Sequence, residues 1–333
     1  MIYFRLLLAL AFLGLLAVAG YAGWYVATPM RMPAHPVQVE VPAGSSLRAA
    51  MGNLARAGIG VRPLQFEILV RVLRRDQEIK AGYYGFAAPM TPLQLVDKLA
   101  RGDVLQSEVQ VLEGWTFGEL RAALDASQAL RHDSTGLSDT ALLKRIGASE
   151  PHPEGLFFPD TYVVARGSSD LTLLRYAHHT MQQHLARQWS QRAADLPYKT
   201  PYEALIMASI VERETGRAEE REQIAGVLVN RLRIRMALQA DPTVIYGLGK
   251  NFDGNLKKVH LKTDGPYNTY TRRGLPPTPI ALPGLAALRA AMQPAQIKDL
   301  YYVSRSDGTS QFSRTLQEHN RAVSRYQLKS RRR

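Results

Sequence analysis

The chain has 333 residues and a formal net charge of +13, from 42 lysines and arginines against 29 acidic residues. That length allows two domains with separate cores, and the charge favours an anionic partner such as nucleic acid, acidic lipid or an acidic cell-wall polymer. There is no cysteine, which excludes disulfides, cysteine nucleophiles and cysteine metal sites. The eight histidines show no HxH or HxxxH spacing, so we expect no metal and no cofactor.

The first segment, Leu6 to Ala27, is a continuous uncharged run that is long enough to span a bilayer. Tyr21, Trp24 and Tyr25 cluster at its far end, as in an interfacial aromatic belt. We therefore predict that residues 1–28 form a short cytoplasmic stub and a single transmembrane anchor.

A cleaved signal peptide is the alternative to a retained anchor, because Ala17-Val18-Ala19 resembles a cleavage site. The apolar run continues well past that site, which favours the anchor. Arg5 before the run favours an inside N-terminus, although Arg31 on the other side makes the positive-inside bias slight. We predict a body on the outer side of the membrane, joined through a linker at residues 29–36 that contains three prolines.

A small β-α-α-β unit is expected directly after the linker. Alternating apolar residues predict its strands, and apolar residues at helical spacing predict its helices. In chain order these elements are Val37–Val41, Leu47–Ala57, Pro63–Arg75 and Lys80–Phe86. A further amphipathic helix at Thr91–Ala100 completes a first domain over residues 37–105.

Residues 106–150 are expected to connect this first domain to a larger one. Gln106–Leu112 alternates as a strand does. Thr116 is followed three residues later by Glu119, which is the capping-box signature of a helix start. The polar stretch at residues 125–149 favours helix without a clear pattern.

The larger domain is expected at residues 151–328, followed by a basic tail at residues 329–333. It begins with a turn-rich, aromatic loop at Pro151–Tyr162. Asp241-Pro242 is expected to interrupt regular secondary structure, and residues 251–266 are expected to form a loop. The predicted helices are Leu171–Gln191, Thr200–Gly216, Arg217–Met236, Leu285–Met292 and one opened by Thr315, and the predicted hairpin pairs Leu300–Ser304 with Gln311–Ser313.

The helix Thr200–Gly216 is the most informative of these elements. Thr200 can cap it, with Glu203 in the capping-box position. The run Ala204–Val211 is almost wholly apolar, so this helix should be buried, yet it ends in charged residues. At ~100° per residue, Glu214 falls in the middle of the apolar face and Glu212 on the other side.

A carboxyl group on an apolar face loses solvation, and its pKa rises towards the value that a general acid needs near neutral pH. Glu214 is therefore the candidate acid. The alternative is a structural ion pair between Glu214 and an arginine at the helix end, such as Arg213, Arg217 or Arg221, because such pairs also perturb pKa values.

The proline-rich segment Tyr267–Pro283 has no regular period. It can be a structural loop locked by proline. It can also be a rigid wall that presents polar and aromatic side chains to a long polar substrate, since long loops inside compact domains are often functional. The side chains concerned are Tyr267, Asn268, Tyr270, Arg272 and Arg273.

Several common kinds of site are missing from the sequence. There is no Walker A loop, GxGxxG, GxSxG or HExxH motif. Basic residues are dispersed, and an exported body also argues against a nucleic-acid partner. One desolvated glutamate with tyrosines and amides in nearby loops remains, and these groups suit a glycan-cleaving cleft.

Five strings of the sequence resemble one known family. They are KAGYYGF, EGLFFPDTY, ASIVERET, NRLRIRMALQADPTVIYGLG and YNTYTRRGLPPTPIALPG. Together they look like the MltG (YceG-like) endolytic murein transglycosylases, and the resemblance covers nearly the whole chain after the apolar segment. The resemblance implies an α+β protein with an N-terminal transmembrane helix, a small LysM-like β-α-α-β subdomain and a larger mixed catalytic domain with a buried catalytic helix.

In this family the catalytic residue is the second glutamate of the E-x-E segment, which falls on Glu214. Other candidates for substrate binding lie in the downstream strings. They are Gln239, Asp241, Thr243, Tyr246, Asn268 and Tyr270. The resemblance implies cleavage of the MurNAc–GlcNAc bond with formation of 1,6-anhydro-MurNAc, which ends nascent glycan strands. A muramidase-type hydrolase using Asp241 as second carboxylate, and a non-catalytic wall-binding anchor, are the alternatives.

The expected partners follow from the anchor and the resemblance. They are peptidoglycan glycan strands, the lipid bilayer around residues 6–27, and peptidoglycan synthases, with no nucleic acid. The expected location is the inner (cytoplasmic) membrane, crossed once, with the catalytic body on the periplasmic or extracytoplasmic side.

Overall fold

The structure is a computed structural model that describes residues 2–214, 217–305 and 307–328, and it divides into two compact units. Unit 1 comprises residues 1–108, 129–131 and 163–168, and unit 2 comprises residues 109–128, 132–162 and 169–333. Helices and short strands are mixed in it, which confirms the α+β prediction. The predicted basic tail at residues 329–333 lies outside the described residues.

Unit 1 begins with α1 (Ile2–Ala27), a helix of 26 residues, none of them buried. Its mean hydropathy reaches 2.3, so it is long and apolar enough to cross a membrane. A signal sequence passes the same test of length and composition.

The predicted β-α-α-β order follows α1. Strands β1 (Val37–Val41) and β2 (Gly82–Phe86) pair antiparallel, with Val39 opposite Tyr84. Helices α2 (Leu47–Arg56) and α3 (Pro63–Val72) lie between these strands in the chain, and α4 (Pro92–Arg101) follows them.

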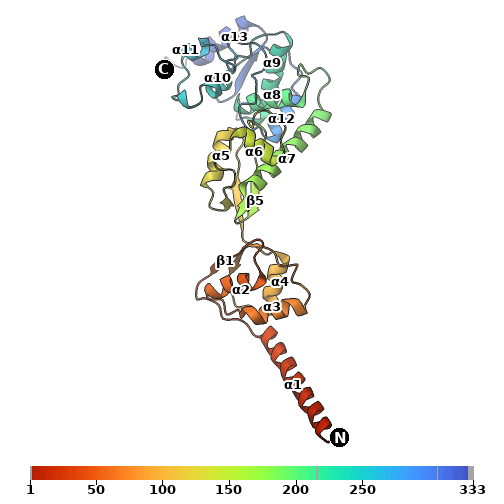
Figure 1. Cartoon of the computed structure of the whole chain (residues 1–333). Coiled ribbons are helices and arrows are strands. Elements are labelled where there is room, and N and C mark those ends of the chain that lie inside the picture. The colour runs from red at the N-terminus through yellow and green to blue at the C-terminus, as the bar shows by residue number, and fades with distance from the viewer. Residues whose placement is uncertain (1, 215–216, 306, 329–333) are drawn as a thin grey trace. The chain divides into compact units, whose positions relative to one another are not determined.

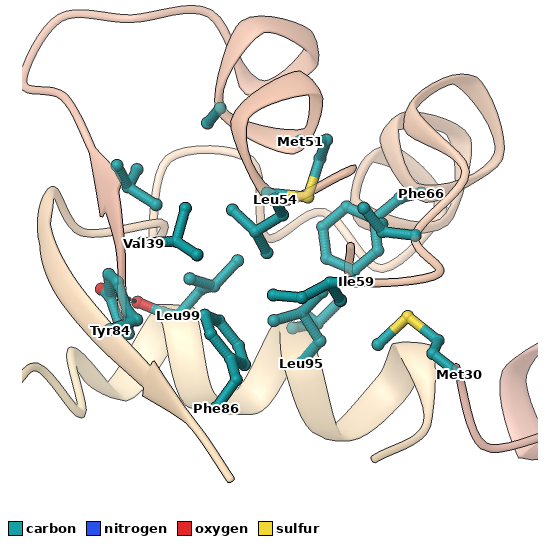
Figure 2. Packing of buried hydrophobic residues seen from close by; sticks show 14 of the residues in the cluster. Met30, Val39, Met51, Leu54, Ile59, Phe66, Tyr84, Phe86, Leu95 and Leu99 are labelled. Carbon is teal, nitrogen blue, oxygen red and sulfur yellow. Dashed lines mark hydrogen bonds between the residues drawn. The ribbon is translucent and has the colours of Figure 1, made fainter. Parts of the chain in front are cut away.

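Apolar side chains from all these elements form the core of unit 1 (Figure 2). Leu54 of α2, Phe66 of α3 and Leu95 of α4 are completely buried there. Tyr84 of β2 joins them, and its hydroxyl donates to the backbone oxygen of Lys80 at 2.7 Å, so burying the phenol leaves no polar atom unpaired.

Two short strand pairs follow, and the boundary between the units falls within them. Strand β3 (Gln106–Gln110) pairs with β5 (Thr161–Ala165), and β4 (Leu130–Arg131) pairs with β6 (Ser168–Ser169). Helix α5 (Phe117–Ala126) starts at the predicted Thr116–Glu119 capping box. Helix α6 (Asp139–Ile146) lies in the polar stretch at residues 125–149, which was expected to favour helix.

Four helices form the centre of unit 2 (Figure 1). They are α7 (Asp170–Ser190), α8 (Pro201–Glu214), α9 (Arg221–Arg233) and α12 (Leu285–Met292). Helix α8 contacts the other three, and all of Ala204–Val211 is buried. Small residues of α12, including Ala287 and Ala291, allow close packing on α8.

The remaining elements of unit 2 are short, and the first of them packs against α8. They are α10 (Asp241–Leu248), α11 (Lys258–Lys262), the hairpin β7 (Tyr301–Ser304) and β8 (Ser310–Ser313), and α13 (Leu316–Val323), with 3-10 turns at Ala218–Glu220 and Gly249–Asn251 and a π turn at Ser324–Leu328. The hairpin is antiparallel, as predicted.

Three local predictions were wrong in detail. Asp241-Pro242 begins α10 instead of breaking the chain, because proline needs no N–H partner in the first turn of a helix. Helix α9 starts at Arg221, four residues after the predicted start at Arg217. The expected loop at residues 251–266 contains the short helix α11.

Candidate active site

Glu214 is the last residue of α8, and the start of that helix is defined by local hydrogen bonds. The Thr200 hydroxyl accepts from the Glu203 N–H at 3.2 Å. The Glu203 carboxylate accepts from the Lys199 N–H, so only one half of the predicted capping box is formed. Burial of Ala204–Val211 then holds the helix in the centre of unit 2, with Glu214 at the edge of this core.

Three side chains from three other elements act on the Glu214 carboxyl. Tyr302 of β7 donates a hydrogen bond to it, and Arg231 of α9 and Asp241 of α10 act through their charges. Burial raises the pKa of Glu214 to about 7, the negative charge of Asp241 adds to this rise, and Tyr302 and Arg231 oppose it. Glu214 is nevertheless only half-buried and keeps some contact with solvent. A carboxyl with this pKa can donate a proton and take one back near neutral pH.

Arg231 is a buried cation, 6% exposed, that is held by backbone carbonyls. Its Nε donates to the oxygen of Leu300 at 2.7 Å, and its Nη1 donates to the oxygen of Leu238 at 2.6 Å. The guanidinium also lies over the ring of Tyr301, 5.4 Å from its centroid. A cation fixed away from water in this way acts on neighbouring charges with little screening.

Glu212 has different partners, although burial raises the pKa of this carboxyl too. Its Oε2 accepts from the N–H of Gly284, the N-cap residue of α12, at 2.9 Å. Its Oε1 lies 3.8 Å from Arg221, one of the arginines considered as a partner for Glu214. Hydrogen bonding therefore distinguishes the two glutamates, whereas burial alone does not.

Asp241 and Tyr270 lie together at the start of α10. The Tyr270 hydroxyl donates to Asp241 Oδ1 at 2.5 Å, and burial together with this carboxylate raises the pKa of Tyr270. Both residues interact electrostatically with Glu214. Gln239 is exposed nearby in the chain, with a left-handed φ of 51° and its N–H bonded to the oxygen of Thr269 at 3.1 Å.

Thr243 and Asn268, two other predicted substrate-binding residues, are buried in the framework of the site. The Thr243 hydroxyl lies 2.8 Å from the oxygen of Ala240, to which it donates, and 2.9 Å from the Thr269 hydroxyl. The Asn268 amide donates to three backbone oxygens between residues 260 and 263, and its oxygen accepts from the Tyr270 N–H. These side chains hold the loop that positions Tyr270.

Tyr246 lies in a groove of about 1070 Å³ on unit 2. Helices α5 and α10 and loop residues such as His152, Tyr267 and Ile280 line the groove. The rings of Tyr246 and Tyr267 meet edge to face, with centroids 4.9 Å apart. Glu214 is not among the lining residues, but Arg213 and Pro242 are, so the groove reaches the neighbours of Glu214 and Asp241 in the chain.

Glu154, at the wall of this groove, is a second carboxyl with a perturbed pKa. It is 3% exposed, and burial raises its pKa to about 7. Its Oε1 accepts from the Phe117 N–H at 2.9 Å, and its Oε2 accepts from the Tyr246 hydroxyl at 3.0 Å. Glu154 thus joins the start of α5 to α10 across the groove.

Three functional candidates were missed in the sequence analysis: Tyr302, Arg231 and Glu154. Arg231 follows a long apolar run in α9, and Glu154 stands in an otherwise aromatic segment, so both were detectable as charged residues in apolar surroundings. Tyr302 carries no such signal. Within residues 2–214, 217–305 and 307–328, no three His, Asp or Glu side chains come together as metal ligands.

The fold and the site together define a mixed α+β protein whose second unit holds a desolvated carboxylic acid at the end of its central helix. A family model described as the YceG-like family matches residues 39–325. The chain therefore belongs to the YceG-like family.

Known relatives agree with this membership. A protein of Bacillus subtilis (strain 168) named endolytic murein transglycosylase is 28% identical over 312 residues, which cover 87% of this chain and 84% of that protein. One of the same name from Streptococcus pneumoniae serotype 2 (strain D39 / NCTC 7466) is 27% identical over 357 residues, and the match spans 95% of this chain but 64% of that longer protein. The crystal structure of a YceG-like protein from Listeria monocytogenes matches 87% of this chain and 99% of its own, with a TM-score of 0.55 and 27% identity.

Proposed function

We propose that this protein is a peptidoglycan lytic transglycosylase that cleaves the MurNAc–GlcNAc bond of glycan strands and leaves 1,6-anhydro-MurNAc ends. The observation that carries the proposal is the Glu214 carboxyl, with a pKa raised to about 7 and a hydrogen bond from the Tyr302 side chain. The names of the relatives in Bacillus subtilis and Streptococcus pneumoniae support a murein transglycosylase activity.

The reaction uses Glu214 twice. As the neutral acid, Glu214 gives its proton to the glycosidic oxygen, and the C1–O4 bond breaks while the N-acetyl group of the substrate stabilises the positive charge at C1. The Glu214 carboxylate then takes the proton of the muramic 6-hydroxyl, and O6 bonds to C1 to close the anhydro ring. No water is consumed, so the acid returns to its starting state.

Tyr302 and Arg231 act between these two proton transfers. Both interactions favour the charged form of Glu214, which exists only after the first transfer. Burial and Asp241 favour the neutral form that begins the reaction. The opposing effects keep the pKa near 7, where neither proton transfer is strongly uphill.

A muramidase-type hydrolase is the second candidate function, because Asp241 is near enough to raise the pKa of Glu214. A hydrolase needs a second carboxylate, roughly 5 to 9.5 Å from the first, to activate water or to act as nucleophile. In this protein Asp241 already accepts a hydrogen bond from Tyr270, which suits a fixed charge or a substrate contact equally well.

Mass spectrometry of digested glycan strands distinguishes the candidates. The transglycosylase gives 1,6-anhydro ends and incorporates no ¹⁸O from labelled water, whereas a hydrolase gives labelled reducing ends. Glu214→Gln is expected to lower the rate roughly 100- to 10,000-fold, the usual contribution of a general acid, and Asp241→Asn to leave the product unchanged. Anhydro products formed at full rate by Glu214→Gln would contradict the proposal, and a protein that binds glycan without cleaving it would be a wall-binding anchor.

The rest of the architecture supports a role at the membrane. We propose that α1 anchors the protein once in the inner membrane, with the body on the outer side, where the glycan strands are. The β-α-α-β order and antiparallel β1–β2 pair of unit 1 fit a LysM-like wall-binding subdomain. On this proposal the enzyme cuts nascent strands close to the membrane, next to peptidoglycan synthases.

We further propose that the glycan strand binds in the groove that reaches Arg213 and Pro242 and continues over the neighbouring residues Glu214 and Asp241. The edge-to-face tyrosines Tyr246 and Tyr267 offer apolar surface for sugar rings. Asp241, Tyr270 and the exposed Gln239 offer polar groups for hydroxyls and N-acetyl groups. Thr243 and Asn268 contribute by holding this wall in place, because their own polar atoms are already bonded.

A further inference from the structure

Helix α3 of unit 1 carries an exposed row of apolar side chains. Leu64, Ile68 and Val72 recur every four residues and are 59%, 54% and 74% exposed. The opposite side of the same helix, with Phe66 and Val70, is buried in the core of unit 1. Three large aliphatic side chains aligned on one exposed helix face are more than the scattered apolar residues of an ordinary surface.

The start of α3 is bonded to the far end of α1. The Tyr21 hydroxyl of α1 accepts from Arg62 Nη1 at 3.2 Å and from Gln65 Nε2 at 2.8 Å. Arg62 is the N-cap residue of α3, and Gln65 lies in its first turn. On a helical wheel with 100° per residue, Gln65 lies next to Val72, so the contact with α1 borders the apolar row.

Basic side chains accompany the apolar row. Arg62, Arg71 and Arg74 are all exposed at or beside α3. Arg71 pairs with Glu67 at 2.8 Å on the flank of the helix, but its side chain is still 71% exposed. An apolar helix face bordered by arginines is the pattern of a helix that lies in the interface of an anionic bilayer.

We propose that α3 lies on the membrane surface next to α1, with Leu64, Ile68 and Val72 in the headgroup and acyl boundary and the arginines at lipid phosphates. The inference rests on the proposed span of α1. Tyr21 belongs to the aromatic cluster at the end of the span that is typical of the membrane interface, and its bonds to Arg62 and Gln65 bring α3 to the same level. The bilayer surface would then be bound by unit 1 as well as crossed by α1.

The absence of cysteine makes the test direct, because a single introduced cysteine can be spin-labelled in the full chain. We would label Ile68→Cys on α3, Leu10→Cys within α1 and Ser45→Cys on an exposed turn of unit 1, each in vesicles of phosphatidylcholine with phosphatidylglycerol. Collisions with oxygen, which concentrates in lipid, are compared with collisions with a polar nickel complex, which stays in water. All three sites are exposed, so the substitutions leave the core intact.

The ratio of oxygen to nickel collisions is expected to be several-fold higher at position 68 than at position 45, and to approach the ratio at position 10. Adding Ile68→Asp to a Val72→Cys label should lower the ratio at position 72 towards that of water. Vesicles without phosphatidylglycerol should also lower the ratio at position 68, because the arginines lose their anionic partners.

Three outcomes would overturn the inference, and they are distinguishable. Lipid at position 10 with water at position 68 leaves the anchor intact and shows that α3 faces solvent. Water at both positions removes the anchor as well as the inference. A label at position 68 that is shielded from both reagents indicates a protein partner or a second copy of the chain on α3.

Discussion

At the scale of single residues, the charge state of Glu214 depends on two neighbours with opposite effects. Asp241 raises its pKa, and the Tyr302 hydrogen bond lowers it. On the proposed mechanism Glu214 must be protonated to start the reaction, so its pKa should set the alkaline limb of the pH–rate profile, near pH 7 in the wild type. Tyr302→Phe is therefore expected to move this limb to higher pH, and Asp241→Asn to lower pH, when kcat is measured across pH 5 to 9.

Opposite shifts in these two variants would identify the limb as the titration of Glu214. A matched control is Tyr301→Phe, which removes the hydroxyl of the neighbouring residue of β7 and leaves the Tyr302 hydrogen bond to Glu214 in place. Shifts in the same direction in both variants, or a limb that moves as far with Tyr301→Phe, would contradict the assignment.

Glu154 gives a second residue-scale prediction, which concerns stability. Burial raises its folded pKa to about 7 from an ordinary value of 4.5. The unfolded chain therefore loses its proton first as pH rises from 4.5 to 7, and stability falls through that window by about 3 kcal/mol. Below pH 4.5 the Glu154 carboxyl is protonated in both the folded and the unfolded chain, and above pH 7 it is ionised in both. Its contribution to the free energy of unfolding therefore changes with pH only between these values.

Glu154→Gln should remove this pH dependence, because the amide carries no charge, its oxygen can still accept from the Phe117 N–H and its NH2 can donate to the Tyr246 oxygen. Urea unfolding at pH 4.5 and 7.5 gives the difference between wild type and variant at each pH. The pKa values of Glu214 and Glu212 are also raised, so these residues change stability with pH in the same direction. Both residues are present in wild type and variant, so their contributions cancel in the difference. A difference that stays the same at the two pH values would show that Glu154 ionises normally.

The position of Glu214 at the end of a buried helix could be predicted from sequence because the information that determines it is local. The apolar run of α8 and the helical period place it beside the core without knowledge of any other element. Tyr302 and Arg231 come from β7 and α9, and their approach to Glu214 is decided by how those elements pack on α8, which no periodic pattern encodes. Thr243 and Asn268 were named as candidate substrate contacts from strings that resemble the family, and no local pattern could show that both side chains are buried.

At the scale of elements, α8 and α12 are joined at their ends by Glu212. Its carboxylate accepts the Gly284 N–H at the start of α12, and its side chain is 7% exposed. Glu212→Ala leaves that buried N–H without a partner and is expected to cost about 1–3 kcal/mol of unfolding free energy. Glu212→Gln keeps an acceptor and should cost less, and both variants should keep the pH–rate profile of the wild type.

Glu214→Gln is the matched comparison for the Glu212 variants. It should lose activity without losing stability, because it replaces a carboxyl that burial destabilises in its charged form with a neutral amide of the same shape. Thermal unfolding and glycan cleavage measured on the same preparations separate the two effects. If Glu212→Gln abolished cleavage in a stably folded protein, the division of roles between the two glutamates would be wrong.

Elements defined by local signals were predicted to the residue. The alternation of β1 and the apolar spacing of α12 gave their bounds, and capping boxes placed the starts of α5 and α13. The start of α10 was not recognised because Pro242 was taken as a break, although proline is favourable in a first turn. Helix α6 lies in a stretch that was expected to favour helix, but its bounds could not be placed because its short apolar face is completed only by packing against α7.

At the scale of the whole molecule, the net charge of +13 should attract the protein to its proposed substrate. Peptidoglycan carries carboxylates, so the positive field of the protein should raise the protein concentration near the glycan strands and the rate of encounter. The Debye length falls from about 10 Å at 0.1 M salt to about 3 Å at 1 M, so added salt weakens this attraction. On the proposed mechanism the chemical step takes place at the largely desolvated Glu214 carboxyl, where charges are screened much less by salt.

We therefore expect kcat/KM on intact glycan strands to fall as salt rises from 0.05 to 0.5 M, while kcat stays nearly constant. The control substrate is the same glycan with its carboxylates amidated, for which kcat/KM should respond little to salt. An equal response of both substrates would mean that salt acts on the protein itself and not on the encounter. A fall in kcat with constant KM would place the charge effect in the active site, against a role for the overall field.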